Sequence, residues 1–221
     1  LNRLESHAAR AFFTSPFGEH PNMSAHIFRT AISHVGQALR EPEAFATAWQ
    51  TEQRRYPWFV WAGLMATAIL GTTTYGMSMG LLGGVERILA CGFLCTLAAG
   101  LAWAIPLPAL YIINSMTGSR LPVGSTVLAA LVTTSWGGLA MIASIPINWF
   151  FTVAIPYAPF IFLVNVVVFA GVGISMMDVF GRVMEKLEPE RGRVPVLWLL
   201  LVGAIGGELF YFFGLFEFVV R

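Results

Sequence analysis

Charged residues are scarce in this chain of 221 residues. Asp, Glu, Lys and Arg make up 11% of it, against about a quarter of a typical soluble domain, and the mean hydropathy is +0.71. The formal net charge is only +1 and the sequence holds no basic block, which argues against binding to nucleic acid. The composition therefore predicts an integral membrane protein.

The residue sets of common catalytic and metal sites are also missing. All four histidines lie in the first 34 residues, before any long apolar run, so the apolar runs lack the usual axial ligand for haem or chlorophyll. The two cysteines, Cys91 and Cys95, lie one helical turn apart and are expected to be buried thiols. No P-loop, GxSxG or HExxH motif occurs. We therefore expect no enzyme, metal or resident cofactor, while a bound lipid or pigment stays open.

Long apolar runs dominate the chain after residue 57. Residues 88–113 and 123–145 contain no charged residue and flank a short polar turn, residues 114–122. At about 1.5 Å per residue, either run would cross a hydrocarbon core of roughly 30 Å as a helix. The predicted fold class is an all-α membrane protein with a five-transmembrane-helix bundle. The expected spans are about residues 58–79, 88–113, 121–147, 158–180 and 194–219.

The connectors between these spans differ in character. Residues 181–193 are polar and carry both signs of charge, as a solvated loop does. Residues 148–157 are aromatic and uncharged, so we expect them to lie as a connector in the membrane interface. Pro106 and Pro108 are expected to kink the second span and to free backbone carbonyls.

Residues 1–57 are predicted to form an N-terminal amphipathic helical tail, separate from the transmembrane domain at residues 58–221. Apolar residues recur at helical spacing in residues 4–12, 28–39 and 45–49, and Pro42 between two glutamates is typical of a helix start. Three short helices lying on a membrane or on partner subunits explain this pattern. A tail that orders only within a complex is the alternative.

The basic residues predict the orientation. With five spans, eleven of the thirteen Lys and Arg residues share the side of the tail, and only Arg87 and Arg221 lie on the other. The positive-inside rule then places the N-terminus in the cytoplasm and the C-terminus in the periplasm of a bacterial-type inner membrane.

Glu208 is the one carboxylate deep within a predicted span, where an ionisable group is costly. Counting from the cytoplasmic ends predicts a polar layer at its depth. The other members of this layer are Asn165, Thr72, Thr73, Thr74, Thr133, Thr134 and Ser135. A neutral Glu208 hydrogen-bonded to Asn165, a threonine or a carbonyl would hold the bundle together. A proton or cation site in a small transporter, or a contact to lipid, cofactor or partner, stays open.

Glycines spaced four residues apart allow close approach of membrane helices. The candidate packing glycines are Gly76, Gly80 and Gly84 near the end of the first span, and Gly203 and Gly207 in the fifth. Packing within the bundle and docking onto a neighbouring subunit both stay open.

Short motifs run from the tail into the third span: Arg-Glu-Pro-Glu-Ala-Phe at residues 40–45, Leu110-Tyr111, Gly118 and Ile145-Pro146. Through them the chain resembles the bacterial Yip1-like integral membrane family, over about residues 40–219. That family also has an amphipathic cytoplasmic tail and five spans. The resemblance implies a membrane-organising or trafficking-type role, with no catalytic residues to transfer.

Three functions are consistent with these features. The first is a non-catalytic accessory subunit or scaffold in a larger membrane complex, of respiratory or photosynthetic type for example. Its partners would be other membrane protein subunits and lipids. The second is a small proton- or cation-coupled transporter that uses Glu208, and the third is a Yip1-like membrane-organising protein.

Overall fold

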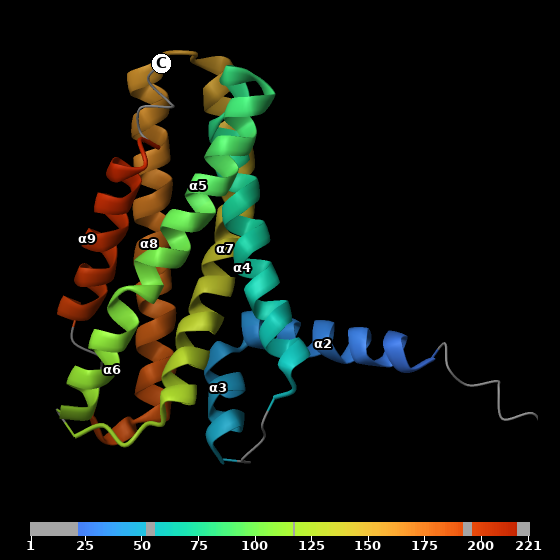
Figure 1. The fold of residues 1–221 in the computed structure, drawn as a ribbon, viewed down its shortest axis with the longest axis vertical. Helices are drawn as coiled ribbons and strands as arrows, with labels where there is room; N and C mark the ends of the chain where they lie inside the picture. Colours follow the sequence, from blue (N-terminus) through green and yellow to red (C-terminus); the bar gives the residue numbers. More distant parts are fainter. Residues whose placement is uncertain (1–21, 52–55, 117, 192–195, 216–221) are drawn as a thin grey trace, which may run out of the picture.

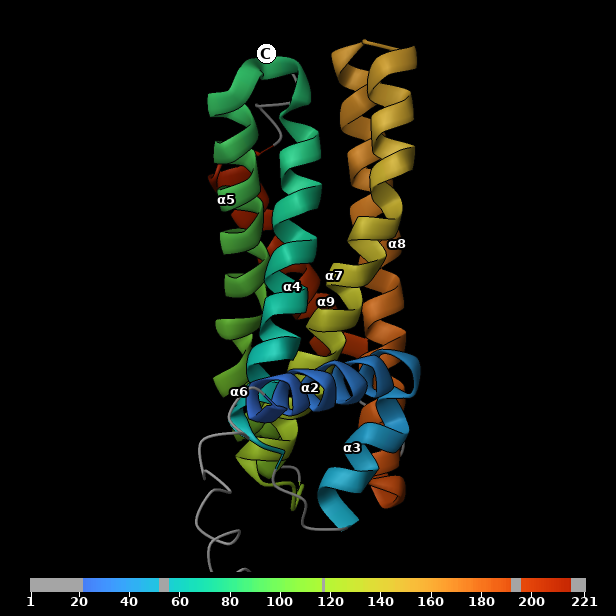
Figure 2. The ribbon, with the colours of Figure 1, turned by 90° about the vertical axis from the view of Figure 1, so that its right-hand side faces the viewer.

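The computed structural model describes residues 22–51, 56–116, 118–191 and 196–215, and this part of the chain consists of helices and turns. The α-helices are α2 (Asn22–Arg40), α3 (Pro42–Thr51), α4 (Trp58–Met79), α5 (Gly84–Ala104), α6 (Pro106–Met116), α7 (Val123–Ala154), α8 (Ala158–Leu187) and α9 (Val196–Phe212). Two short 3-10 turns, η1 (Leu81–Gly83) and η2 (Pro189–Arg191), precede α5 and follow α8. The long helices run side by side, and α2 lies across them near one end (Figures 1 and 2).

Three segments of the described chain are helical, long and apolar enough to cross a membrane. They are Leu81–Met116, Val123–Ala154 and Ala158–Leu187. The described apolar part of α9, Leu200–Phe212, is shorter. The structure therefore supports an all-helical membrane protein, as the composition predicts.

The second predicted span, residues 88–113, bends at its prolines. α5 ends at Ala104 and α6 begins at Pro106. Pro106 and Pro108 have no N–H to donate to the carbonyls four residues earlier, which interrupts the helical bonding pattern. The N–H of Ile105 still donates to the carbonyl of Leu101 at 3.0 Å, so the chain stays coiled through the bend. The predicted kink is confirmed.

The predicted connector at residues 148–157 is wrong over most of its length. α7 continues through Pro146 to Ala154, and only residues 155–157 form the turn to α8. A proline in a membrane helix removes one backbone bond, which a bundle tolerates when the residues around it are well packed. Asn148 and Thr152, in the extension, are both buried, so this part of α7 belongs to the packed bundle.

α8 is also longer than predicted. Beyond the continuous apolar run, apolar residues still recur on one face of the helix. It continues beyond residue 180 to Leu187. Val183, Met184 and Leu187 in this extension are buried in one cluster with Ala46 of α3. The predicted polar loop at residues 181–193 is therefore helical in its first half.

α3 packs on the end of the bundle, against α7 and α8. Phe45 is fully buried and stacks on Tyr56, with ring centroids 4.2 Å apart, while the Tyr56 hydroxyl donates to the Phe45 carbonyl at 3.1 Å. The bundle thus covers the apolar face of α3, which is not free to lie on a membrane. α2 differs, since its Phe28 and Ile32 are 68% and 55% exposed. The helix predicted in residues 4–12 lies outside the described residues.

Candidate functional site

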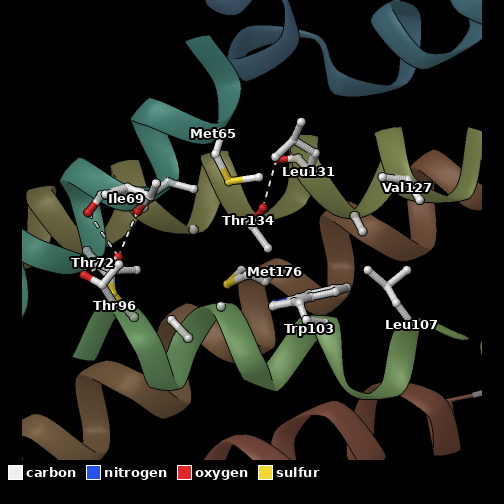
Figure 3. A pocket seen from close by; sticks show the side chains of 18 residues that line it. Met65, Ile69, Thr72, Thr96, Trp103, Leu107, Val127, Leu131, Thr134 and Met176 are labelled. Carbon is white, nitrogen blue, oxygen red and sulfur yellow. Dashed lines mark hydrogen bonds between the residues drawn. The ribbon is translucent and has the colours of Figure 1, made fainter. Parts of the chain in front are cut away.

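An apolar cavity of about 230 Å³ lies inside the bundle between α4, α5 and α7. Met65 of α4, Trp103 of α5 and Met176 of α8 point toward this space, and Leu107 of α6 lines one end of it (Figure 3). Gly137 of α7 makes room for Met176, because a Cβ there would lie 2.3 Å from the Met176 sulfur. Side chains from five helices therefore shape one space.

The threonine hydroxyls at the cavity wall are already hydrogen-bonded within the protein. The Thr96 hydroxyl donates to the Gly92 carbonyl at 3.0 Å and accepts from the Thr72 hydroxyl at 3.2 Å. The Thr134 hydroxyl donates to the Leu131 carbonyl at 3.0 Å. The described lining includes no acidic, basic or histidine side chain. This wall suits a molecule without charge and with few hydrogen-bonding groups.

Close helix contacts hold one end of the cavity wall together. A Cβ on Gly76 of α4 would lie 2.6 Å from the Cys91 carbonyl oxygen of α5, and one on Gly80 would lie 2.7 Å from the Arg87 carbonyl oxygen. Two of the glycines predicted to allow close packing therefore do so. Toward its other end α5 departs from α4 (Figure 1), and Met65 and Ile69 on α4 are exposed beside that gap in the packing.

Another close helix crossing involves a glycine that the spacing did not indicate. A Cβ on Gly71 of α4 would lie 2.2 Å from the Gly138 carbonyl oxygen of α7, and one on Gly138 would lie 2.8 Å from the Thr67 carbonyl oxygen. Gly71 belongs to no GxxxG pair with the predicted glycines, so the four-residue spacing did not identify it. The crossing brings the backbones of α4 and α7 together beside the cavity.

The remaining predicted glycines have other settings. Gly84 has φ +84° at the start of α5, and nothing lies within 4 Å of a Cβ placed there, so its role is conformational. Nothing lies within 4 Å of a Cβ on Gly207, and a Cβ on Gly203 would only reach Met177 at 3.8 Å. Of the two alternatives for these glycines, close packing within the bundle is not seen among the described residues at these three positions, and docking onto a neighbouring subunit stays a prediction.

The predicted polar layer is divided among separate contacts. Asn165 is fully buried, and its Oδ1 accepts a hydrogen bond of 2.9 Å from the Tyr75 hydroxyl. The Thr73 and Thr96 hydroxyls are 2.7 Å apart. Thr133, like Thr134, donates to a carbonyl of its own helix, that of Ala129. Thr133 and Thr134 thus bond within their own helix, Thr73 pairs with a threonine of α5, and Asn165 takes a partner that was not predicted.

Glu208 does not join these side chains. It is exposed on α9, which packs mainly against α5, and makes no hydrogen bond or ion pair with the described residues. Among the described residues, Glu208 therefore makes no hydrogen bond to Asn165 or to the threonines, and its depth in the membrane stays a prediction. Equal depth along two helices leaves open the direction in which each side chain points.

A second buried polar contact escaped the sequence analysis. Nδ2 of Asn148 on α7 donates to the Ser78 hydroxyl of α4 at 2.9 Å, and that hydroxyl donates to the Tyr75 carbonyl at 2.6 Å. Oδ1 of Asn148 is buried without a partner among the described residues. Asn148 was placed in a connector because Pro146 precedes it, and a helical interpretation of residues 147–154 would have found it.

Comparison of the chain with family models, curated proteins and solved structures finds no match. The resemblance to Yip1-like proteins therefore stays a prediction. In the described ranges, no cluster of three or more His, Cys, Asp or Glu side chains could hold a metal ion.

Proposed function

We propose that this chain is a non-catalytic subunit or scaffold of a larger membrane assembly, with five spans and its N-terminus in the cytoplasm. The observation that carries the proposal is the exposed face of α9. On this face a carboxyl group and two glycines are exposed, and no backbone of another described helix lies within 4 Å of a Cβ placed on either glycine. Another transmembrane helix that covers this face would explain why a carboxyl group and glycines are exposed on a helix in lipid.

The two spans beyond the three clearest ones are supported by their place in the bundle. α4 has 22 residues, a length of about 33 Å, and contacts α5 and α7 along much of it. α9 runs beside α5 (Figure 1). Five crossings would place the basic residues of the tail, of residues 117–122 and of residues 181–193 on one side, as the positive-inside rule requires.

On the α9 face, Gly203, Gly207 and Tyr211 follow one another at intervals of four residues, and Glu208 precedes Tyr211 by three. Gly203, Gly207, Glu208 and Tyr211 are all exposed. Glycines allow two helix backbones to approach closely in lipid, where van der Waals contact drives association. A carboxyl group in hydrocarbon is costly unless it is hydrogen-bonded, so Glu208 favours a partner helix that presents a donor or acceptor. We expect that helix to belong to another membrane subunit.

The assembly test compares variants of this face after extraction in mild detergent. The wild-type protein should migrate with other membrane subunits on a native gel. Gly207→Leu and Glu208→Leu should release it, while Glu208→Gln, which keeps hydrogen bonding, should retain a larger fraction in the complex. Gly171→Leu is the matched control, since Gly171 is an exposed glycine of α8 with open space around it. A wild-type chain that migrates alone, or a complex unaffected by both leucine variants on α9, would contradict the proposal.

The topology test uses single cysteines at exposed positions. The native cysteines are buried, so they give little background labelling. Leu82→Cys and Tyr157→Cys should react with a membrane-impermeant maleimide in spheroplasts, in which the outer face of the inner membrane is accessible. Trp58→Cys and Met116→Cys should react only after the membrane is opened. Labelling of Trp58→Cys and Leu82→Cys from the same face would show that α4 does not cross.

A transporter built on Glu208 has weaker support. Its carboxylate lies apart from Asn165 and the threonines, and the cavity wall carries no titratable side chain among its described residues. Proton-driven uptake that is lost in Glu208→Gln would favour the transporter over the scaffold.

A further inference from the structure

We propose that the cavity between α4, α5 and α7 binds one acyl chain of a membrane lipid. This inference rests on the proposed membrane span of α4, which puts the cavity at the depth of the hydrocarbon. It does not depend on the α9 face or on any partner subunit. The occupant is assigned from the chemistry of the wall, the size of the space and the place where it opens.

The wall selects against polar ligands. The hydroxyls of Thr72, Thr96 and Thr134 are engaged within the protein, and the other described lining groups are apolar side chains and glycines, apart from the indole N–H of Trp103. A headgroup, ion or sugar placed here would lose its hydration and find no charge in return, with the Trp103 indole as the single side-chain N–H of the described wall. A hydrocarbon chain has no hydration to lose, because the cavity and the surrounding lipid are both apolar environments.

The space is large for an empty cavity in a packed core. Protein interiors contain few voids larger than a water molecule, and an apolar cavity of about 150 Å³ already accepts benzene. The cavity here measures about 230 Å³, below the range of about 300–1,000 Å³ that is common for pockets that enclose small ligands. A segment of a flexible chain fits such a space better than a rigid molecule of several rings.

The cavity opens sideways, between helices. Met65 and Ile69 on α4 are 50% and 45% exposed, and Gly100 on α5 is exposed as well. Trp103 and Leu131, also in the wall, are 9% and 8% exposed and lie farther inside. In a bundle that spans the bilayer, an opening between two helices faces lipid tails. An acyl chain can therefore enter from the side, without leaving the hydrocarbon.

Small residues maintain this space along α5. Ala99, Gly100 and Ala104 line it, and a Cβ on Gly100 would meet nothing within 4 Å. Larger side chains at these positions would be expected if the space only needed to be filled. Gly100→Leu should therefore fold and occupy the space in which a lipid chain would lie.

The test follows the fluorescence of Trp103, which bromine atoms quench on contact. The full chain is reconstituted in vesicles of phosphatidylcholine with both acyl chains brominated near their middle, and in unbrominated vesicles of the same lipid. The difference between wild type and Trp103→Phe gives the Trp103 component of the emission. In wild type this component should be lost, or nearly so, in the brominated vesicles.

Two variants decide whether the brominated acyl chain reaches Trp103 through the cavity. Gly100→Leu should restore the Trp103 emission in brominated vesicles, and Ala104→Leu provides a second block if the first variant does not fold. Gly171→Leu, with the same substitution on an exposed face of α8, should remain quenched like wild type.

An unquenched Trp103 in wild type, or equal quenching in Gly100→Leu, Ala104→Leu and wild type, overturns the acyl-chain site. Failure of the cysteine topology test at α4 would instead overturn the membrane placement on which the inference depends. The two failures are distinguishable because the labelling experiment needs no lipid in the cavity.

Discussion

The hydroxyl of Tyr75 on α4 donates a hydrogen bond of 2.9 Å to Oδ1 of Asn165 on α8, and both residues are fully buried. Nδ2 of Asn165 in turn donates to the Ile161 carbonyl at 2.9 Å. Tyr75 also packs edge-on against Phe169, one turn beyond Asn165 on α8, with ring centroids 5.3 Å apart. This polar contact links two helices whose surroundings are otherwise apolar.

Tyr75→Phe is expected to destabilise the folded bundle by about 0.6 kcal/mol and by no more than about 1.7 kcal/mol, the average and the maximum found for hydrogen bonds between membrane helices. The phenyl ring keeps the packing against Phe169 and removes only the donor, so Oδ1 of Asn165 loses its partner. Unfolding by increasing SDS in mixed micelles measures the change.

A double-mutant cycle controls for packing at this pair. Asn165→Leu alone should also destabilise, because the Tyr75 hydroxyl is then buried without an acceptor. Combining it with Tyr75→Phe removes both partners and should cost less than the sum of the single changes. Additive single effects would mean that the two side chains are not coupled.

Gly71→Ala is expected to destabilise the bundle by about 1–3 kcal/mol, as overpacking in a core does. The added Cβ would lie 2.2 Å from the Gly138 carbonyl oxygen, so α4 and α7 must move apart. Gly171→Ala is the matched control and should be neutral or slightly stabilising, because open space surrounds Gly171 within its helix. Equal stability of the two variants in SDS unfolding would rule out the close crossing.

Asn148→Leu is expected to change stability by less than about 1 kcal/mol, in contrast to Asn165→Leu. Oδ1 of Asn148 is buried without a described partner, so its removal offsets the lost bond to Ser78. The Ser78 hydroxyl still donates to the Tyr75 carbonyl. A large loss of stability in Asn148→Leu would indicate that Oδ1 has a partner, such as a buried water.

The docking of α3 should depend on salt. Arg182 of α8 bonds to Glu43 of α3 and to Asp178, and these side chains are partly exposed, so the ion pairs contribute only about 0–1 kcal/mol. Arg182→Gln should increase hydrogen exchange in α3 slightly at low salt, and the difference should shrink at high salt. Faster exchange that persists unchanged in high salt would mean that Arg182 acts through packing.

The resistance of α3 to exchange should come mainly from its apolar contacts. Phe45→Ala removes a fully buried ring stacked on Tyr56 and should expose α3 far more than Arg182→Gln does. Comparable exchange in the two variants would contradict this ranking.

Much of the local structure followed from the sequence alone. Scarce charge and long apolar runs predicted an all-helical membrane protein, because only helices and closed barrels satisfy the backbone in lipid. Pro106 and Pro108 predicted the bend between α5 and α6, because a proline lacks the N–H that would bond to the carbonyl four residues earlier in the same helix. Gly76 and Gly80 lie at a close helix contact, as their spacing indicated.

Only the tertiary structure decided which side chains meet. Depth along a helix can be counted from its end, but the direction of a side chain depends on how each helix is rotated and tilted against its neighbours. Asn165 therefore turned toward Tyr75, while Glu208 at a similar predicted depth turned outward on α9. Gly71 meets Gly138, and Gly207 meets no other helix in the described part of the chain, for the same reason: a glycine permits close approach, and the packing of whole helices determines where it occurs.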